Sequence, residues 1–492
     1  MGWEPPRARA LQTAQSDDVH SVREMAVSLR QRNAAFAVLF AAVFLAVHWP
    51  LYVEPGVRLG WNSDASLYGL MAREMVATRQ PLFLFWGGDY LGTLTSMWAV
   101  LASLFAGEVG PLALRLGNAL QFVIALLLFG DGLRRVYGWG AGAFAILWLA
   151  AGPSFFFKLT YAPVSAEQMF FVGAVVFWLA VRKPLTGAVS WLVLGILCGL
   201  GFWAHRGALF VVLPAVAIGL WYDRARPLMA GACGLAGTAI GLLPQFLGRM
   251  EIDQRLYTPL AGPWSLRRVV EQLTMKDLVG FLGAGHWSVA VLAVALAAYA
   301  LRGMPRTRGH ALALGVVITV FGFWTLSGLA YPGALRYLIL ALPIVYAWIA
   351  AGILRFRRLG FVALLVAVAL CAVRHRDARE IAAGHREQHE HWPGGFDPRP
   401  VLAVLDRERY PVCYADFWLA YKLEWLSTSG VQFIPYRSVN STQVRSLRLA
   451  AAPGEKCFVT LQGEVRRLSG SEQAELRADT IALVRGRPAV PR

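Results

Sequence analysis

Residues 34–53 read AAFAVLFAAVFLAVHWPLYV, a run without Lys, Arg, Asp or Glu. A helix needs about 20 such apolar residues to cross a bilayer. Further apolar runs follow at 111–130, 139–153, 165–181, 187–204, 208–222, 228–247, 286–301, 311–330, 334–353 and 359–373. Only 16% of the residues are charged, against about 25% in soluble domains. The sequence therefore predicts an all-α polytopic membrane protein with about 11 transmembrane helices.

One more apolar run, 93–107, decides the orientation. When it is left out of the count and the N-terminus is placed in the cytoplasm, every short cytoplasmic loop carries a basic cluster, as the positive-inside rule requires. The clusters are Arg134 and Arg135; Arg182 and Lys183; Arg224 and Arg226; Arg302, Arg306 and Arg308; and Arg355, Arg357 and Arg358. Basic clusters in such loops are the ordinary source of a positive net charge, here +17, in a membrane protein, so no nucleic-acid partner is expected. We expect 93–107 to form an interfacial or re-entrant helix on the outer side.

The chain divides into three parts. Residues 1–33 are expected to form a cytoplasmic leader, 34–373 a transmembrane domain and 374–492 a polar extracytoplasmic segment. The outer segments 54–110 and 248–285 are long, and long loops in compact proteins are often functional or disordered. In 374–492, helix-like and strand-like runs alternate, which predicts a small α/β domain. An outer compartment permits disulfides, so Cys413 and Cys457 either form a bridge or remain two buried thiols on neighbouring strands.

The first outer segment contains the strongest candidate for chemistry, WNSDASLYGLMAREMV at residues 61–76. Helical spacing places Leu67, Leu70, Met71 and Met75 on one side, which predicts an amphipathic helix lying on the bilayer. Asp64 stands at the start of this helix, with Ser63 beside it, and either residue can serve as an N-cap. A plain cap is therefore one explanation of Asp64, and a catalytic carboxylate at the membrane surface is the other.

Carboxylates are unevenly divided between the two sides, with ten of the twelve in 34–373 falling outside. Asp89 follows two glycines in PLFLFWGGDYLGTLTSMW, which is a turn signal among aromatic residues. Glu167 begins the fourth predicted span, where Ser165 and Glu167 can cap the helix, because acids are favoured at helix N-termini. Lys158 lies on the same side and can pair with Glu167 or with a phosphate. Each residue thus has a structural explanation beside the functional one.

In order and spacing, these segments resemble the GT-C superfamily of polyprenyl-phosphate-dependent glycosyltransferases, most of all the branch of bacterial aminoarabinose and protein-mannosyl transferases. That family has an acidic motif after the first span, then membrane-surface helices and a glycine-containing entry to the second span that ends in Arg-Leu. Here the entry reads FAGEVGPLALRLGNAL, with Arg115, and a later typical segment reads RYLILALP, starting at Arg336 and Tyr337. The resemblance covers roughly 34–360. Many relatives have two adjacent acids in the first loop, whereas Ala65 follows Asp64 here.

The resemblance implies roles for particular residues. It makes Asp64 the catalytic aspartate, Asp89 a second acid of the same loop and Glu167 an acid that lines the cavity. A carboxylate base assists a hydroxyl acceptor by about 10²–10⁴-fold, and cations stabilise a phosphate leaving group. The expected substrate-binding residues are Asp89, Glu167, Lys158, His205, Arg206, Arg336 and Tyr337. For the basic members of this set, snorkelling to lipid headgroups is the alternative.

A divalent cation is the alternative source of positive charge. Asp64 and Glu167 would be its ligands, and oxygen ligands favour Mg²⁺, Mn²⁺ or Ca²⁺. The three histidines in GHREQHEHW, at 384–392, suggest a solvated linker rather than a metal site, because no cysteine or second cluster accompanies them.

We therefore expect a cell-envelope glycosyltransferase in the inner membrane, with a cytoplasmic N-terminus and a periplasmic C-terminal domain. Its expected partners are a polyprenyl-phosphate-linked sugar donor, membrane lipid, and a lipid, glycan or protein acceptor, with inversion by a single displacement. A lipid or polysaccharide transporter or flippase remains an alternative, although a transporter is expected to bury charges mid-membrane. A catalytically inactive GT-C-like scaffold is a further alternative.

Overall fold

The fold is given by a computed structural model of the 492-residue chain. The residues that the structure describes are 31, 33–53, 63–86, 91–152, 154–163, 165–224, 226–250, 287–304, 307–326, 334–356, 359–382, 399–408, 411–415, 417–428, 430–435, 456–461, 473–478 and 481–485. The predicted leader, most of the outer segment 248–285 and the histidines of 384–392 lie outside these ranges.

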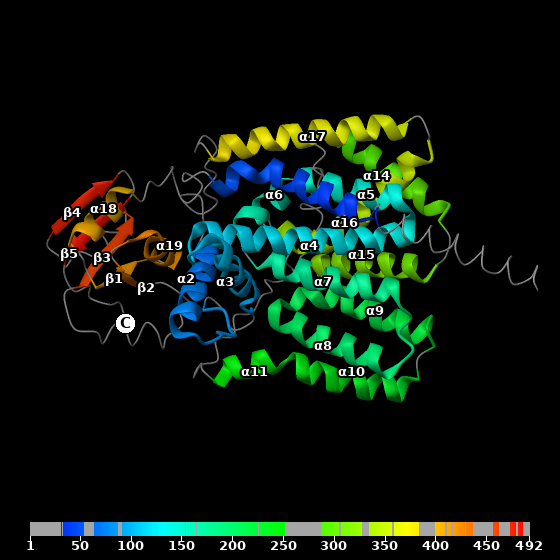
Figure 1. The fold of residues 1–492 in the computed structure, drawn as a ribbon, viewed down its shortest axis with the longest axis horizontal. Coiled ribbons are helices and arrows are strands. Elements are labelled where there is room, and N and C mark those ends of the chain that lie inside the picture. The colour runs from blue at the N-terminus through cyan, green and yellow to red at the C-terminus, as the bar shows by residue number, and fades with distance from the viewer. Residues whose placement is uncertain are drawn as a thin grey trace, which may run out of the picture.

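Apolar helices packed side by side form the main body of the protein (Figure 1). Their bounds follow the apolar runs of the sequence: an N-terminal helix (Asn33–Val53), α4 (Pro111–Tyr137), α5 (Trp139–Ala151), α7 (Ala166–Arg182), α8 (Ala188–Ala204), α9 (Leu209–Trp221), α10 (Pro227–Gly241), α14 (Trp287–Arg302), α15 (Arg308–Leu326), α16 (Leu342–Leu354) and α17 (Leu359–Ala382). Within the described ranges, Asn33–Val53, Pro111–Tyr137 and Pro227–Gly248 are long and apolar enough to cross a membrane, by length and composition. Shorter apolar helices accompany them, as in a multi-pass membrane protein.

Sequence signals mark the ends of α4, the longest helix among the described residues. Pro111 stands in its first turn, where a missing backbone N–H costs nothing because that group has no helical partner. Arg134 and Arg135 lie in its last turn, where cations are favoured by the helix dipole. In between, the ring of Phe129 stacks on those of Phe170 and Phe177, at centroid distances of 5.4 and 5.0 Å, and holds α4 against α7.

Helices α8 and α10 pack through glycines. A Cβ added at Gly195 would lie 2.2 Å from a backbone oxygen of α10, and one at Gly237 or Gly241 would lie 2.2 Å from a backbone oxygen of α8. Small residues at an interface let two backbones approach closely, which is a common way for helices to pack in membranes. The two helices therefore meet backbone to backbone along this seam.

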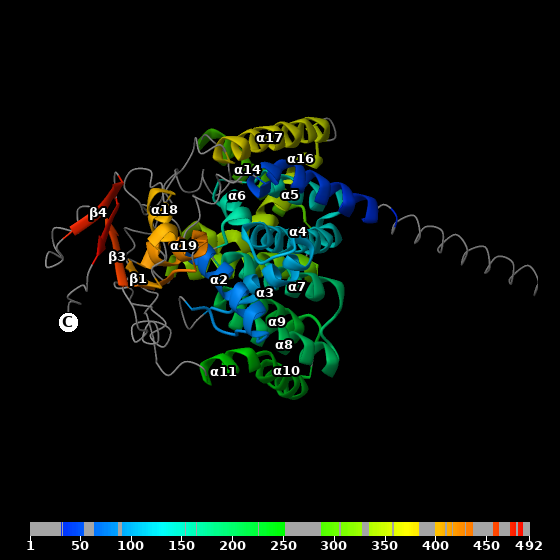
Figure 2. The same ribbon diagram turned by 60° about the vertical axis from the view of Figure 1, so that its left-hand side comes forward.

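Helices α2 (Ser63–Thr78) and α3 (Leu94–Ala106) lie between the bundle and a C-terminal helix, α19 (Phe417–Leu426), as Figures 1 and 2 show. The 13 residues of α3 span about 20 Å, which is short of the roughly 30 Å of a bilayer core. The sequence predicted that the helix after Asp64 buries only one side. This prediction is wrong for its first two turns, because Ala65–Ala72 are all buried. The reason is that α19 covers the side of α2 that faces away from the bundle.

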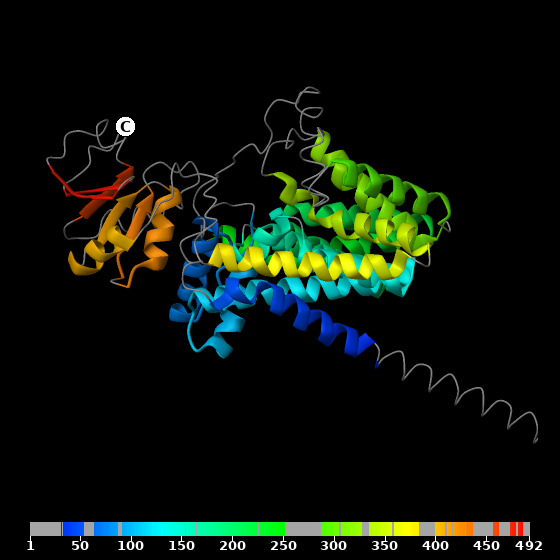
Figure 3. The ribbon, with the colours of Figure 1, turned by 90° about the horizontal axis from the view of Figure 1, so that it is seen from above.

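The C-terminal elements form a five-stranded mixed sheet with two helices, at one end of the bundle (Figure 3). The strands are β1 (Val412–Ala415), β2 (Gln432–Pro435), β3 (Lys456–Leu461), β4 (Gln473–Ala478) and β5 (Ile481–Arg485), in the order β2-β1-β3-β5-β4. β1 pairs in parallel with β2 and β3, and α18 (Arg399–Glu408) precedes it. Cys413 is disulfide-bonded and lies in register with Cys457, the one cysteine that remains once the free Cys198, Cys233 and Cys371 are set aside.

Candidate active site

Asp64 lies in the first turn of α2 and is partly exposed. The helix begins at Ser63, so Asp64 is its second residue and not its N-cap. An acid in this position interacts favourably with the positive end of the helix dipole. The residues that follow, up to Ala72, are buried, so the first turn presents Asp64 from a firmly packed helix.

Glu167 is a buried carboxylate at the start of α7. Its side chain is 1% exposed. One carboxylate oxygen, Oε1, accepts hydrogen bonds from the Thr95 hydroxyl at 2.8 Å and from the backbone N–H of Ser165 at 3.1 Å. A buried carboxylate needs such donors, because burial without partners is costly.

The helix cap at α7 differs from the expected one. Ser165 is the N-cap residue, but its backbone is left-handed, with φ of 75°, and its side chain makes no capping hydrogen bond. The carboxylate of Glu167 instead bonds back to the Ser165 amide. The structural role considered for Glu167 is therefore present, and Thr95 gives the carboxylate a second contact that no local cap requires.

A polar network connects Glu167 to the helix of Asp64. The side-chain amide of Gln168, next to Glu167, donates to the Tyr68 hydroxyl at 2.7 Å and to the Gly92 carbonyl at 3.3 Å. The Ser96 hydroxyl donates to the Tyr68 carbonyl at 2.9 Å. Tyr68 lies one turn after Asp64, so the network places the start of α7 beside the first turns of α2 and α3.

Thr95, Ser96, Gln168 and Tyr68 were missed in the sequence analysis. Their only signal is that they are polar residues within apolar runs, and that signal does not say which partner each will meet. The partners lie 28 to 100 residues away in the chain.

The described residues before and after Asp89 contact the end of α8. Residues 87–90, and with them Asp89, lie outside the described ranges. Before them, the Trp203 indole donates to the Phe83 carbonyl at 2.5 Å. After them, Leu91 forms a β-bridge with His205, and the Phe85 amide donates to the Leu91 carbonyl at 3.0 Å. Both flanks of the loop therefore lie against the end of α8, close to His205.

His205 lies in the connection between α8 and the short 3-10 helix η2 (Arg206–Ala208) and is buried. Its ring lies 5.8 Å from that of Tyr337, in the 3-10 helix η3 (Ala334–Leu340). Burial, together with the positive charges of Arg336 and Arg206, lowers the pKa of His205 to about 3. His205 is therefore neutral at physiological pH, with two arginines near it.

Both arginines also contact aromatic rings and are partly exposed. The guanidinium carbon of Arg206 lies 5.3 Å from the ring centre of Phe202, and that of Arg336 lies 5.3 Å from the ring centre of Tyr337. The structure thus gathers four of the predicted residues, His205, Arg206, Arg336 and Tyr337, in one place. Lys158 belongs to α6 (Ser154–Tyr161), and its side chain lies outside the described set.

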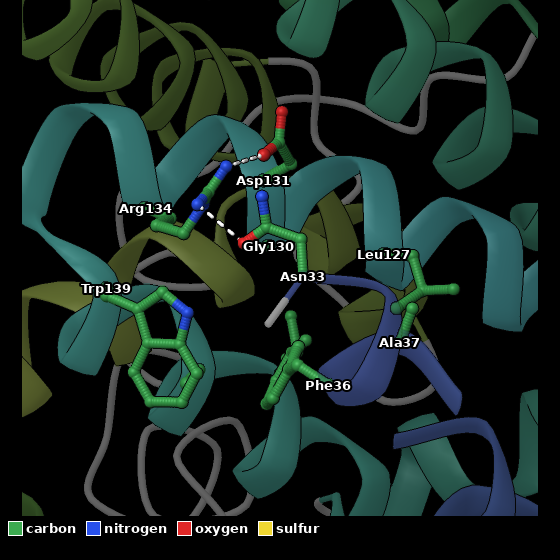
Figure 4. A pocket seen from close by; sticks show the side chains of 10 residues that line it. Asn33, Phe36, Ala37, Leu127, Gly130, Asp131, Arg134 and Trp139 are labelled. Atoms are coloured by element: carbon green, nitrogen blue, oxygen red, sulfur yellow. Dashed lines mark hydrogen bonds and ion pairs between the residues drawn. The ribbon is translucent and has the colours of Figure 1, made fainter. Parts of the chain in front are cut away.

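A pocket lies at the other end of α4, between the N-terminal helix, α4 and α5 (Figure 4). Arg134 in its wall donates to Asp131 at 2.5 Å and to Asn33 at 2.8 Å. Arg134 lies 19 positions after Arg115, which is roughly 28 Å along the helix, and the start of α4 is the end that meets α2. Of the predicted site residues whose side chains the structure describes, none lines this pocket.

The described residues give only weak support to a metal centre. Among them, no group of three or more His, Cys, Asp or Glu side chains could hold a metal ion. One oxygen of Glu167 already accepts two hydrogen bonds. Any cation bound there would share that oxygen with the Thr95 hydroxyl and the Ser165 amide.

Comparison with known proteins supports the resemblance seen in the sequence. No protein-family model matches the chain. It is 28% identical over 211 residues to undecaprenyl phosphate-alpha-4-amino-4-deoxy-L-arabinose arabinosyl transferase 1 of Sodalis glossinidius (strain morsitans), a match that covers 38% of this chain. The chain spans about a third of that relative's length, 34%.

Solved structures match over most of the chain. ArnT from Cupriavidus metallidurans bound to undecaprenyl phosphate has a TM-score of 0.61 at 16% identity, covering 92% of this chain and 98% of that one. The oligosaccharyltransferase AglB from Archaeoglobus fulgidus, in complex with an inhibitory peptide and a dolichol-phosphate, has a TM-score of 0.50 at 13% identity, covering 89% and 70%. The chain therefore shares the fold of ArnT, and part of it resembles an aminoarabinose transferase in sequence.

Proposed function

We propose that this protein is an integral-membrane glycosyltransferase that moves a sugar from a polyprenyl-phosphate donor to an extracytoplasmic acceptor. The observation that carries the proposal is the position of Asp64. It lies in the first turn of a packed helix that is linked to Glu167 through Tyr68 and Gln168, in a chain with the fold of ArnT. One solved structure of ArnT holds undecaprenyl phosphate, which supports a donor of that class here.

In the proposed reaction, an acceptor hydroxyl attacks the anomeric carbon of the donor in a single displacement with inversion. Asp64 accepts the hydroxyl proton as the new carbon–oxygen bond forms. The bond from the anomeric carbon to the phosphate oxygen breaks, and the polyprenyl phosphate leaves with the electron pair. No second carboxylic acid is needed, because a phosphate leaves without protonation, unlike the leaving group of a glycosidase.

The basic residues have a separate part in the proposal. Arg206 and Arg336 lie near each other around His205 and are partly exposed, so they can approach the phosphate of the donor. Fixed positive charge at a leaving phosphate stabilises the charge that develops in the transition state. Asp89, Lys158 and Tyr337 belong to the same proposed donor site.

The orientation proposed is N-terminus in the cytoplasm, with eleven spans and an extracytoplasmic C-terminal α/β domain. Its support is the position of the basic residues at helix ends: Arg134 and Arg135 end α4, Arg182 ends α7 and Arg302 ends α14, all away from Asp64 in the predicted topology. Cytoplasmic loops of membrane proteins are rich in such residues.

The experiment is transfer of radiolabelled sugar from a panel of polyprenyl-phosphate donors into membranes that contain the protein. Asp64→Asn is expected to lower transfer by about 10²–10⁴-fold while insertion and folding persist, since it removes the base. Glu74→Gln is the matched control, because Glu74 is an exposed acid on the same helix. Near-normal turnover by Asp64→Asn would remove Asp64 from the mechanism. The same assay in EDTA, with Mg²⁺, Mn²⁺ or Ca²⁺ added back, tests the divalent-cation hypothesis.

A further inference from the structure

The C-terminal helix α19 packs directly on α2. Trp425 and Tyr421 of α19 are 2% and 1% exposed, and they belong to one apolar cluster with Ala65 and Tyr68 of α2. These α2 residues lie within about one turn of Asp64. The C-terminal unit therefore contributes side chains to the core that surrounds the first turns of α2.

The contact between the two helices is close at Gly69. A Cβ added at Gly69 would lie 2.7 to 2.8 Å from ring carbons of Trp425, a distance at which something must shift. The indole of Trp425 thus rests against the backbone of α2, and α2 cannot move toward α19 without displacing that ring.

Arg73 of α2 also contacts Trp425. Its guanidinium carbon lies 3.8 Å from the ring centre of Trp425, and its Nη1 donates to the Trp425 carbonyl at 3.4 Å. Its Nε donates to the Val109 carbonyl, between α3 and α4, at 3.2 Å. Burial lowers the pKa of Arg73, and the carboxylates of Glu108 and Glu424 oppose this shift.

Helix α19 is in turn attached to the sheet. Glu424, next to Trp425, accepts a hydrogen bond at 2.9 Å from the backbone N–H of Phe433 on β2. A continuous set of contacts therefore runs from the sheet through α19 to α2, whose first turn contains Asp64.

We propose that α19 positions the first turn of α2, with Trp425 and Arg73 as positioning residues for Asp64. This inference rests on the proposed function, in which Asp64 must meet an acceptor hydroxyl. Misplacement of a reacting group by about 1 Å can cost on the order of 10²-fold in rate. The C-terminal unit is then an integral part of the catalytic apparatus, and not an appendage to it.

The kinetic test compares Trp425→Ala with the wild type in the donor panel assay. Trp425→Ala is expected to lower kcat by about tenfold to 10²-fold, with the KM for the donor unchanged, since the donor site itself is intact. Trp425→Phe keeps an aromatic ring for Arg73 and is expected to recover most of the loss. The control is Trp221→Ala, on a tryptophan that is 82% exposed on α9.

A second pair of variants tests the contact without removing the tryptophan. Gly69→Ala places a methyl group against the outer carbons of the indole. It is expected to lower kcat and to leave the KM for the donor unchanged. The shorter side chain of Trp425→Phe makes room for that methyl group. The double variant Gly69→Ala/Trp425→Phe is therefore expected to be more active than Gly69→Ala. Additive losses in the double variant would overturn the proposal.

Hydrogen–deuterium exchange gives a readout that needs no donor. In Trp425→Ala, the backbone amides of 65–72 are expected to exchange at least tenfold faster than in the wild type, while those of α8 and α10 exchange unchanged. Wild-type protection of 65–72 would overturn the positioning role. If exchange rises as expected but the wild type transfers no sugar from any donor, the proposed function fails and the structural coupling stands.

Discussion

Gly237 offers a sharp test of the packing between α8 and α10. A methyl group on Gly237 would lie 2.2 Å from the Leu192 carbonyl oxygen and 2.9 Å from the Ile196 nitrogen. Both atoms belong to the backbone, so neither can rotate away. The two helices must part until that oxygen lies about 3.4 Å from the new methyl group, which is ordinary van der Waals contact. The separation also loosens the contacts of Gly195 and Gly241 along the same seam.

The expected cost of Gly237→Ala is about 1–3 kcal/mol in the free energy of unfolding, as for other overpacked cores. Gly231→Ala is the matched control, because Gly231 lies in the same helix and nothing lies within 4 Å of its added Cβ. There the substitution is expected to stabilise the helix by roughly 0.5–1 kcal/mol. Equilibrium unfolding by SDS in mixed micelles, followed by circular dichroism, measures both variants. Equal free energies of unfolding for the two variants would refute the argument from backbone contact.

Two further predictions concern the candidate site. Thr95→Val removes the hydroxyl that donates to buried Glu167. It is expected to lower the free energy of unfolding by about 1.5–3 kcal/mol in the same SDS titration. Thr95→Ser keeps the donor, so an equal loss in both variants would show that packing matters more than the hydrogen bond. His205 has its pKa lowered from 6.5 to about 3, so between these values the unfolded chain binds a proton that the folded protein does not, and stability rises with pH in this window. His205→Gln is expected to flatten that rise, as measured by thermal unfolding at pH 4.5 and pH 7; an unchanged slope would contradict the assignment.

Much of the bundle can be predicted from the sequence, because in a bilayer the length of an apolar run and the charges at its ends determine a helix. The N-terminal helix was predicted at 34–53 and found at Asn33–Val53, and α8 was predicted at 187–204 and found at Ala188–Ala204. The helix predicted at 93–107 was found at Leu94–Ala106, and its interfacial or re-entrant position on the outer side stays a prediction.

The surroundings of the candidate site could not be predicted in the same way. The burial of α2 depends on α19, and the partners of Glu167 and Gln168 come from α2 and α3. Hydropathy describes one segment at a time, so it cannot say which distant segment covers the second face of a helix. For that reason the sequence indicated Asp64 and Glu167 as candidates but not the residues that connect them.

The contact between Arg73 and Trp425 has a consequence for biosynthesis. Its two residues are separated by 352 positions in the chain, so they can meet only when the ribosome has made most of the protein. Chains fold from the N-terminus during synthesis, and contacts between such distant segments form late. Until then the helix that begins at Ser63 lacks its outer cover, and any polypeptide that ends before Phe417 keeps that surface bare for chaperones and proteases to recognise.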